Sequence, residues 1–177
     1  MSYDCVIGID AGANGGIAYF RNNEVKTLNM PKSLDDFIEL LQYLQSISHP
    51  VVFIEKLSMR PDDVRMDGKG ANLGKMFRIK KMISNYEQLK AAIVCCHLDF
   101  AEVHPLMWQS RLGLRLKGME KAERKREYKC AAQALYPGTT PTLKTADAIL
   151  IMHFGRKIFD DKKWVNKNLN QAKRNLL

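Results

Sequence analysis

The chain has 177 residues and a mass of 20.2 kDa, with 46% apolar and 27% charged residues, which argues against a disordered protein and predicts one globular domain. Twenty-eight Lys and Arg against 19 Asp and Glu give a formal charge of +9 and a pI near 9.4, so the chain suits a polyanionic partner, although a merely solubilising surface is the simpler alternative. Because no apolar run approaches the roughly 20 residues of a membrane span, no membrane segment is expected.

Hydrophobic periodicity and turn residues predict a chain that begins with strands and then alternates helix and strand. The expected strands are residues 4–10, 16–20, 25–30, 51–55 and 98–103. The expected helices are 34–44, 75–94, a short helix or turn at 108–114, a basic helix ending near 134, and 142–159. Glycines and asparagines make tight turns between the first three strands, so these should form an antiparallel meander. The order predicts a mixed α/β sheet with helices on both faces.

One domain should cover residues 1–159, because no linker or internal repeat divides the chain. Residues 160–177 are polar and basic, and they are expected to form a tail or a frayed helix. The four cysteines lack the paired C-x-x-C spacing of a zinc site, and reduced, largely buried thiols are expected. Together with an N-terminus that enters a strand at once, they favour a cytoplasmic protein.

Three acidic residues lie in apolar surroundings. Asp10 and Glu55 each close a strand that should be central in the sheet, and Asp147 lies between two alanines on the last helix. Any one of them could simply cap a turn or pair with a lysine. Carboxylates that converge at strand ends repel one another unless a cation or a proton neutralises them, and Mg²⁺ prefers oxygen ligands. Three such carboxylates can hold two divalent ions for phosphodiester hydrolysis.

Four segments give the chain a resemblance to a known family. They are IGIDAGANGGIAYF, VVFIEKLSMRP, EVHPLMWQSRLGL and KTADAILIMHFGR. In this order they resemble the RuvC-like Holliday-junction resolvases of the ribonuclease H-like superfamily, particularly phage- or virus-encoded forms, over about residues 3–157. The resemblance implies a ribonuclease H-like five-stranded mixed sheet and a crossover junction endodeoxyribonuclease.

The same resemblance carries functional expectations for individual residues. Asp10, Glu55 and Asp147 fall on the family's metal ligands and would be catalytic. The implied cofactor is Mg²⁺, with Mn²⁺ as a substitute, at one or two ions per subunit. The implied partners are branched DNA, especially four-way junctions, and a second copy of the chain in a homodimer that makes paired symmetric nicks. If the protein is phage- or virus-encoded, its compartment would be the host cytoplasm.

The sequence departs from the family pattern at two places. Relatives often carry another acid or a histidine one turn before the final acid, where this chain has Lys144. Either three carboxylates suffice and Lys144 contacts a phosphate, or the second metal site is weakened. Some relatives also use an aromatic wedge shortly after the second acid, where Met59 is the nearest apolar residue here.

Basic residues gather in two regions that could bind DNA phosphates. The predicted DNA-binding residues are Lys69, Lys75, Arg78, Arg115, Lys117, Lys121, Arg124, Lys125 and Lys144. A solvated helix is the competing interpretation of the stretch between Arg111 and Lys129. His104 is expected to be a structural hydrogen-bonding residue and Trp108 a packing residue.

Two alternatives to a junction-resolving nuclease concern the same site. One is a non-catalytic branched-DNA-binding protein with a degenerate metal site, and the other is a ribonuclease H-like nuclease acting on other branched or hybrid substrates. The D-x-G-x-x-G opening at Asp10 also occurs in actin-like phosphotransferases. Those enzymes enclose ATP between two ribonuclease H-like lobes, and 177 residues are expected to provide only one.

Overall fold

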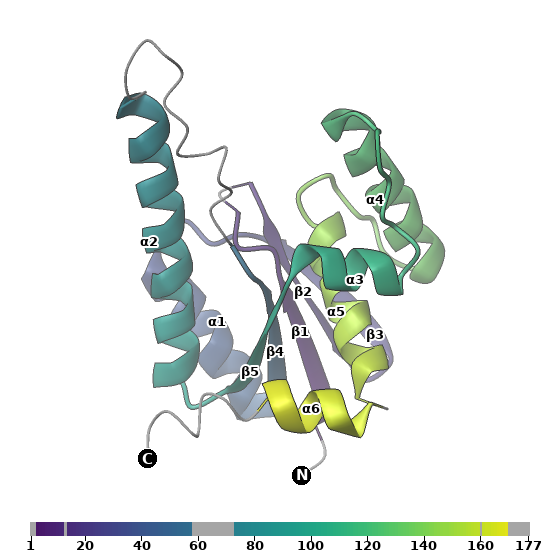
Figure 1. The fold of residues 1–177 in the computed structure, drawn as a ribbon. Coiled ribbons are helices and arrows are strands. Elements are labelled where there is room, and N and C mark those ends of the chain that lie inside the picture. The colour runs from purple at the N-terminus through teal and green to yellow at the C-terminus, as the bar shows by residue number, and fades with distance from the viewer. Residues whose placement is uncertain (1–2, 13, 58–72, 160, 170–177) are drawn as a thin grey trace.

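A computed structural model describes residues 3–12, 14–57, 73–159 and 161–169 (Figure 1). Its centre is a single five-stranded sheet of order β3-β2-β1-β4-β5. The strands are β1 (Cys5–Ile9), β2 (Gly16–Arg21), β3 (Glu24–Asn29), β4 (Pro50–Glu55) and β5 (Asp99–Val103). β1, β2 and β3 pair antiparallel, whereas β4 runs parallel to β1 and β5 runs parallel to β4. The predicted antiparallel meander and the predicted mixed sheet are confirmed.

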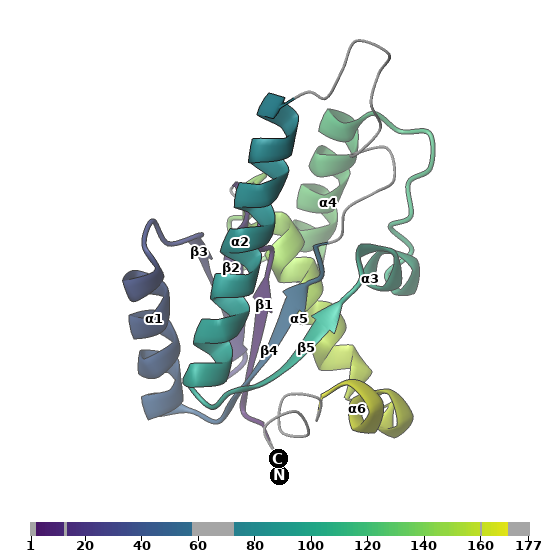
Figure 2. The ribbon, with the colours of Figure 1, turned by 60° about the vertical axis from the view of Figure 1, so that its left-hand side comes forward.

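Helices cover both faces of the sheet, as predicted. They are α1 (Leu34–Ile47), α2 (Leu73–Cys95), α3 (Pro105–Arg111), α4 (Lys121–Leu135), α5 (Ala146–Ile158) and α6 (Lys162–Asn168). Figures 1 and 2 show α1 and α2 on one side of the sheet and α3, α4 and α5 on the other. In both views, α2 and α4 rise past the end of the sheet at which β1 and β4 finish.

Alternating side chains of the strands supply two hydrophobic cores. On β1, Cys5, Ile7 and Ile9 enter the core shared with α1 and α2, while Val6 enters the core shared with α5. Gly8 also faces α5, and a Cβ built there would lie 2.3 Å from the carbonyl oxygen of Ala148. The backbone of α5 therefore packs directly on β1, which is possible only because Gly8 has no side chain.

The helix boundaries differ from the sequence predictions at α5, which begins at Ala146 rather than near residue 142, and at α3, which begins at Pro105 rather than near Trp108. Proline is favoured in the first turn of a helix, where its missing N–H would have no partner. The preceding His104 caps the helix, because its Nδ1 accepts a hydrogen bond from the Leu106 N–H at 3.3 Å. The predicted structural role of His104 is confirmed. The His-Pro pair therefore starts this helix as well as ending β5.

The prediction of largely buried cysteines is only half correct. All four thiols are free, and Cys5 and Cys96 are buried, but Cys95 and Cys130 are exposed. Cys95 lies on the outer side of α2, and Cys130 lies on the outer side of α4, so neither helix presents these positions to a core. Among the described residues, no helix is both long enough and apolar enough to cross a lipid bilayer.

Candidate metal and DNA site

Asp10 lies immediately after β1, in the turn that leads into β2. Its backbone N–H donates to the carbonyl of Gly16 at 3.0 Å, and the N–H of Gly12 donates to its Oδ1, also at 3.0 Å. A Cβ on Gly15 would lie 2.0 Å from the Asp10 carbonyl oxygen, so only glycine fits there. The glycines therefore make the turn, as predicted, and one of them also orients the carboxylate, which is only 7% exposed.

Glu55 ends β4, the strand beside β1, so the parallel pairing brings Glu55 to the same end of the sheet as Asp10. Its Oε1 accepts a hydrogen bond from the indole Nε1 of Trp108 at 3.0 Å. Burial and the neighbouring Asp10 carboxylate raise the pKa of Glu55 from 4.5 to about 8, with Asp147 adding to the effect, although the Trp108 hydrogen bond and Lys125 oppose it. Glu55 is therefore under electrostatic repulsion that a bound cation would relieve.

Asp147 projects from the first turn of α5 and is 6% exposed. Its Oδ2 accepts a hydrogen bond from the Lys125 ammonium at 2.7 Å, while its Oδ1 is buried without a hydrogen-bond partner among the described residues. Burial raises its pKa, Lys125 opposes that rise, and the Asp10 charge adds to it. An unpaired buried carboxylate oxygen is costly, so Asp147 Oδ1 could gain from a ligand such as a bound cation.

Lys125 lies between two of the acids. Its Nζ is 2.7 Å from Asp147 Oδ2 and 3.8 Å from Asp10 Oδ2. Burial lowers the pKa of Lys125, but the Asp147 carboxylate and its hydrogen bond outweigh that, and the net pKa is raised. The side chain comes from α4, which places a positive charge at the point where β1 and α5 bring their carboxylates together.

The donor chemistry of the site fits a hard divalent ion. Asp10, Glu55 and Asp147 supply carboxylate oxygens from three separate elements, their charges act on one another, and one buried oxygen has no partner. The described residues nevertheless do not gather three Asp, Glu, His or Cys side chains closely enough to enclose an ion. In this arrangement the cation beside Asp10 and Asp147 is the Lys125 ammonium.

The predicted DNA-binding residues differ in how far they are described and in how exposed they are. Lys69 lies outside the described residues, as does Met59, and the side chain of Lys75 is likewise not described. Five of the predicted residues are exposed: Arg78 on α2, Arg115 and Lys117 before α4, Lys121 at the start of α4, and Lys144 before α5. Arg124 is half-buried, and Lys125 turns inward to the acids. Lys144 does not fill a ligand position in this arrangement, because it is exposed in the turn before α5.

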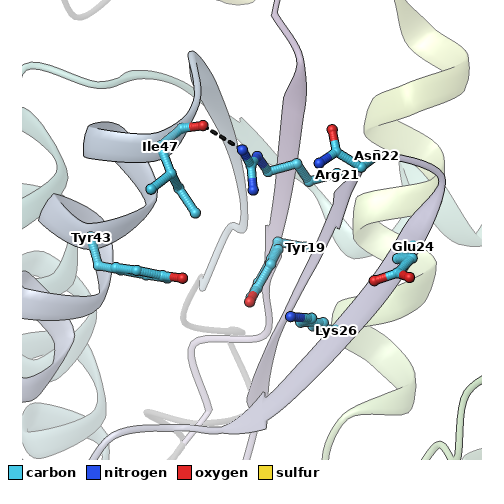
Figure 3. Close-up of a pocket in the computed structure, with 7 residues that line it drawn as sticks. All are labelled: Tyr19, Arg21, Asn22, Glu24, Lys26, Tyr43 and Ile47. Carbon is cyan, nitrogen blue, oxygen red and sulfur yellow. Dashed lines mark hydrogen bonds between the residues drawn. The ribbon is translucent and has the colours of Figure 1, made fainter.

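A separate hollow lies between α1 and the β2–β3 hairpin (Figure 3). Tyr19, Lys26 and Tyr43 line it, and the Arg21 guanidinium donates to the carbonyl of Ile47 at 2.6 Å. Arg21 is at the opposite end of β2 from Gly16, which contacts Asp10. This hollow is therefore separate from the acidic site, and Arg21 satisfies a carbonyl at the end of α1 there.

The sheet order and the helices on both faces are those of a ribonuclease H-like α/β fold. Within that class, the chain is similar to RuvC of T. thermophilus in complex with a Holliday junction substrate, with 12% sequence identity and a TM-score of 0.55 over 89% of this chain and 96% of that chain. A second structure of Thermus thermophilus RuvC gives 13% identity and a TM-score of 0.53 over the same shares.

A yeast mitochondrial Holliday junction resolvase, Ydc2, is also similar, at 17% identity and a TM-score of 0.41 over 92% of this chain and 83% of that chain. That score is too low to support an argument. No protein-family model matches the sequence, and no curated protein sequence matches it either. The predicted resemblance to RuvC-like resolvases is thus confirmed for the fold.

Two contacts within the site go beyond what sequence reasoning predicts. Trp108, for which only packing is expected, is fully buried but also holds Glu55. Lys125, which is expected to face DNA, instead pairs with Asp147. The sequence indicates only that Lys125 lies on the inward side of its helix, since Lys125, Tyr128 and Ala132 follow i, i+3, i+7 spacing and the latter two are buried in the core.

Proposed function

We propose that this chain is a divalent-metal-dependent endonuclease that cuts branched DNA, with four-way junctions as its main substrate. The observation that carries the proposal is the electrostatic coupling of Asp10, Glu55 and Asp147 at one end of a RuvC-like sheet, with the buried Asp147 Oδ1 unpaired. One of the similar structures, RuvC of T. thermophilus, is in complex with a Holliday junction substrate, which supports this choice of DNA.

Asp10, Glu55 and Asp147 would hold one or two Mg²⁺ or Mn²⁺ ions. Bound there, the metal supplies activation of a water molecule and stabilisation of the leaving 3′ oxygen. The chain's own residues prepare the site: the Gly12 N–H orients Asp10, and the Trp108 indole fixes Glu55. Exposed basic residues on α2 and α4, helices that flank this end of the sheet, would bind the phosphates on either side of the cut.

A homodimer is part of the proposal, because paired nicks on opposite strands require two active sites related by symmetry. The beginning of α2 supports it, since Met76 and Phe77 are 51% and 69% exposed on this helix. Large apolar side chains left open to water favour contact with another surface.

The direct test incubates the protein with synthetic four-way, forked and linear DNA and with an RNA–DNA hybrid, in Mg²⁺, Mn²⁺ or EDTA, and maps the cuts on each strand. We expect paired symmetric nicks confined to the four-way junction and lost in EDTA. Cleavage of the hybrid alone would instead assign the chain to another ribonuclease H-like activity.

A second candidate is a branched-DNA-binding protein without nuclease activity. The Lys125–Asp147 pair favours it, because an ammonium already neutralises part of the acidic site. In that case, the wild type would bind junctions but leave them intact with either metal. Activity gained by Lys144→Asp, which restores an acid one turn before Asp147, would then identify a degenerate metal site.

A further inference from the structure

Lys125 is held in place by the packing of its own helix. One turn further along α4, Tyr128 is buried and stacks edge-on against Trp108, with ring centroids 5.2 Å apart. Ala132, on the same face, is completely buried. The ammonium thus reaches the acids from a helix that is anchored through the same tryptophan that binds Glu55.

Neighbouring lysines on α4 lack this arrangement. Lys121 and Lys129 precede and follow Lys125 by four residues, and both side chains are exposed. Lys125 is half-buried, and it is within 4 Å of two carboxylates. A lysine that is held in this way loses hydration and side-chain freedom. The interactions of its ammonium with the two carboxylates must offset that loss of free energy.

The ammonium and a divalent ion would compete for the same oxygens. Asp147 Oδ2 is taken by Lys125, and Asp10 Oδ2 is 3.8 Å from the same nitrogen. An ion bound to these two carboxylates would lie close to the ammonium, and two cations at such a separation repel strongly away from bulk water. Both can act at this site only if Lys125 leaves Asp147 when the ion arrives.

We infer that Lys125 is a built-in counter-ion, which holds Asp10 and Asp147 together without metal and is displaced when a divalent ion binds. The inference rests on the proposed function only in taking these acids as the metal ligands. The displaced ammonium stays on α4, beside the site, where a DNA phosphate is a suitable new partner. Lys125 is thus a positioning residue whose pairing depends on ion occupancy.

Calorimetric titration of DNA-free protein with Mn²⁺ tests the competition. Lys125→Met keeps the apolar stem but removes the charge, and it should bind Mn²⁺ about tenfold more tightly than the wild type because a charge-assisted pair no longer opposes the ion. Lys129→Met makes the same charge change on the exposed side of α4 and should bind like the wild type. Lys125→Arg retains the positive charge and should also bind more weakly than Lys125→Met. Equal or weaker binding by Lys125→Met would overturn the inference.

A second measurement needs no variant and guards against one that fails to fold. In the wild type, the side-chain ammonium signal of Lys125 in ¹H–¹⁵N NMR should shift or broaden as Mg²⁺ is added, while the signal of Lys129 should not. An unchanged Lys125 signal at Mg²⁺ saturation would contradict displacement. Neither readout uses DNA, so tight ion binding by an inert protein would overturn only the nuclease proposal. An active nuclease whose Lys125→Met variant binds Mn²⁺ no more tightly would overturn only this inference.

Discussion

Opposing effects act on the pKa of Glu55. Burial and Asp10 favour its protonated form, while the Trp108 N–H and Lys125 favour its carboxylate, and the first two prevail. Its pKa of about 8 means that Glu55 is mostly protonated at neutral pH when no cation is bound. A divalent ion would reverse that balance, since it would favour the ionised form.

Glu55 should therefore make the metal-free protein less stable as the pH rises. A carboxyl whose pKa is raised by folding keeps its proton in the folded state after the unfolded chain has lost it, so its stabilising contribution is complete below about pH 4.5 and disappears as the pH rises through about 8. The rise from 4.5 to about 8 corresponds to at most about 5 kcal/mol.

We predict that Glu55→Gln removes this fall in stability. In EDTA, the free energy of unfolding of the wild type should decrease between pH 5 and pH 8 relative to that of the variant, as measured by urea denaturation at each pH. Glu39→Gln, which changes an exposed residue of α1, should follow the wild type. If the free energies of unfolding of the wild type and Glu55→Gln changed with pH in parallel, folding would not raise the pKa of Glu55.

At the scale of elements, the packing of α5 on β1 determines where Asp147 lies. A Cβ at Gly8 would be 2.3 Å from the Ala148 carbonyl oxygen and 2.4 Å from the Met152 nitrogen, both backbone atoms of α5. Gly155 is equally restricted, since a Cβ there would meet the Phe53 ring at 2.4 Å. Two glycines, one on the strand and one on the helix, therefore allow the close contact that brings Asp147 to Asp10.

We predict that Gly8→Ala destabilises the protein by about 3 kcal/mol, because backbone atoms cannot move aside as a flexible side chain could. Chemical denaturation measures the loss. Gly138→Ala is the matched control, since a Cβ there would meet nothing within 4 Å, and it should change the stability little. Comparable stabilities for the two variants would contradict the described contact between α5 and β1.

The sequence predicted the elements well where a pattern is local. Apolar runs that end in an acid identified β1 and β4 and placed Asp10 and Glu55 at one end of the sheet, as the parallel register confirms. The start of α3 was less predictable, because a His-Pro pair is read equally well as the end of one element or the start of the next. The pairing of Lys125 with Asp147 depends on how α4 packs against the rest of the fold, which helical spacing alone does not specify.

At the scale of the whole molecule, the chain carries a formal charge of +9, and among its described basic residues Lys125 lies directly beside the acidic site. Exposed basic residues lie on α2 and α4, helices that extend beyond the sheet at the end where Asp10 and Glu55 lie (Figure 2). This arrangement would bring DNA to carboxylates that would otherwise repel its phosphates. The sequence does not predict which basic residues contact DNA, because a surface lysine has the same sequence pattern around it whether or not it contacts DNA.

Junction binding should depend on salt through the exposed basic residues before and at the start of α4. We predict that Lys117→Gln combined with Lys121→Gln weakens junction binding and lowers the slope of log K against log salt by about 2, one for each lost phosphate contact. Binding is measured by fluorescence anisotropy in EDTA over a salt series. Lys26→Gln with Lys157→Gln removes the same charge from exposed positions on β3 and late α5, and it should leave the slope close to that of the wild type. Equal slopes for the two double variants would mean that only net charge matters.

Asp10→Asn tests whether Asp10, Glu55 and Asp147 form the catalytic centre of a junction nuclease. This change keeps the size of the side chain, and the new amide oxygen can still accept the Gly12 hydrogen bond, so the turn and the DNA-binding surface should persist. In Mg²⁺, we predict that Asp10→Asn binds a four-way junction as tightly as the wild type but does not cut it. Cleavage by Asp10→Asn at the wild-type rate would show that Asp10 is not a catalytic residue.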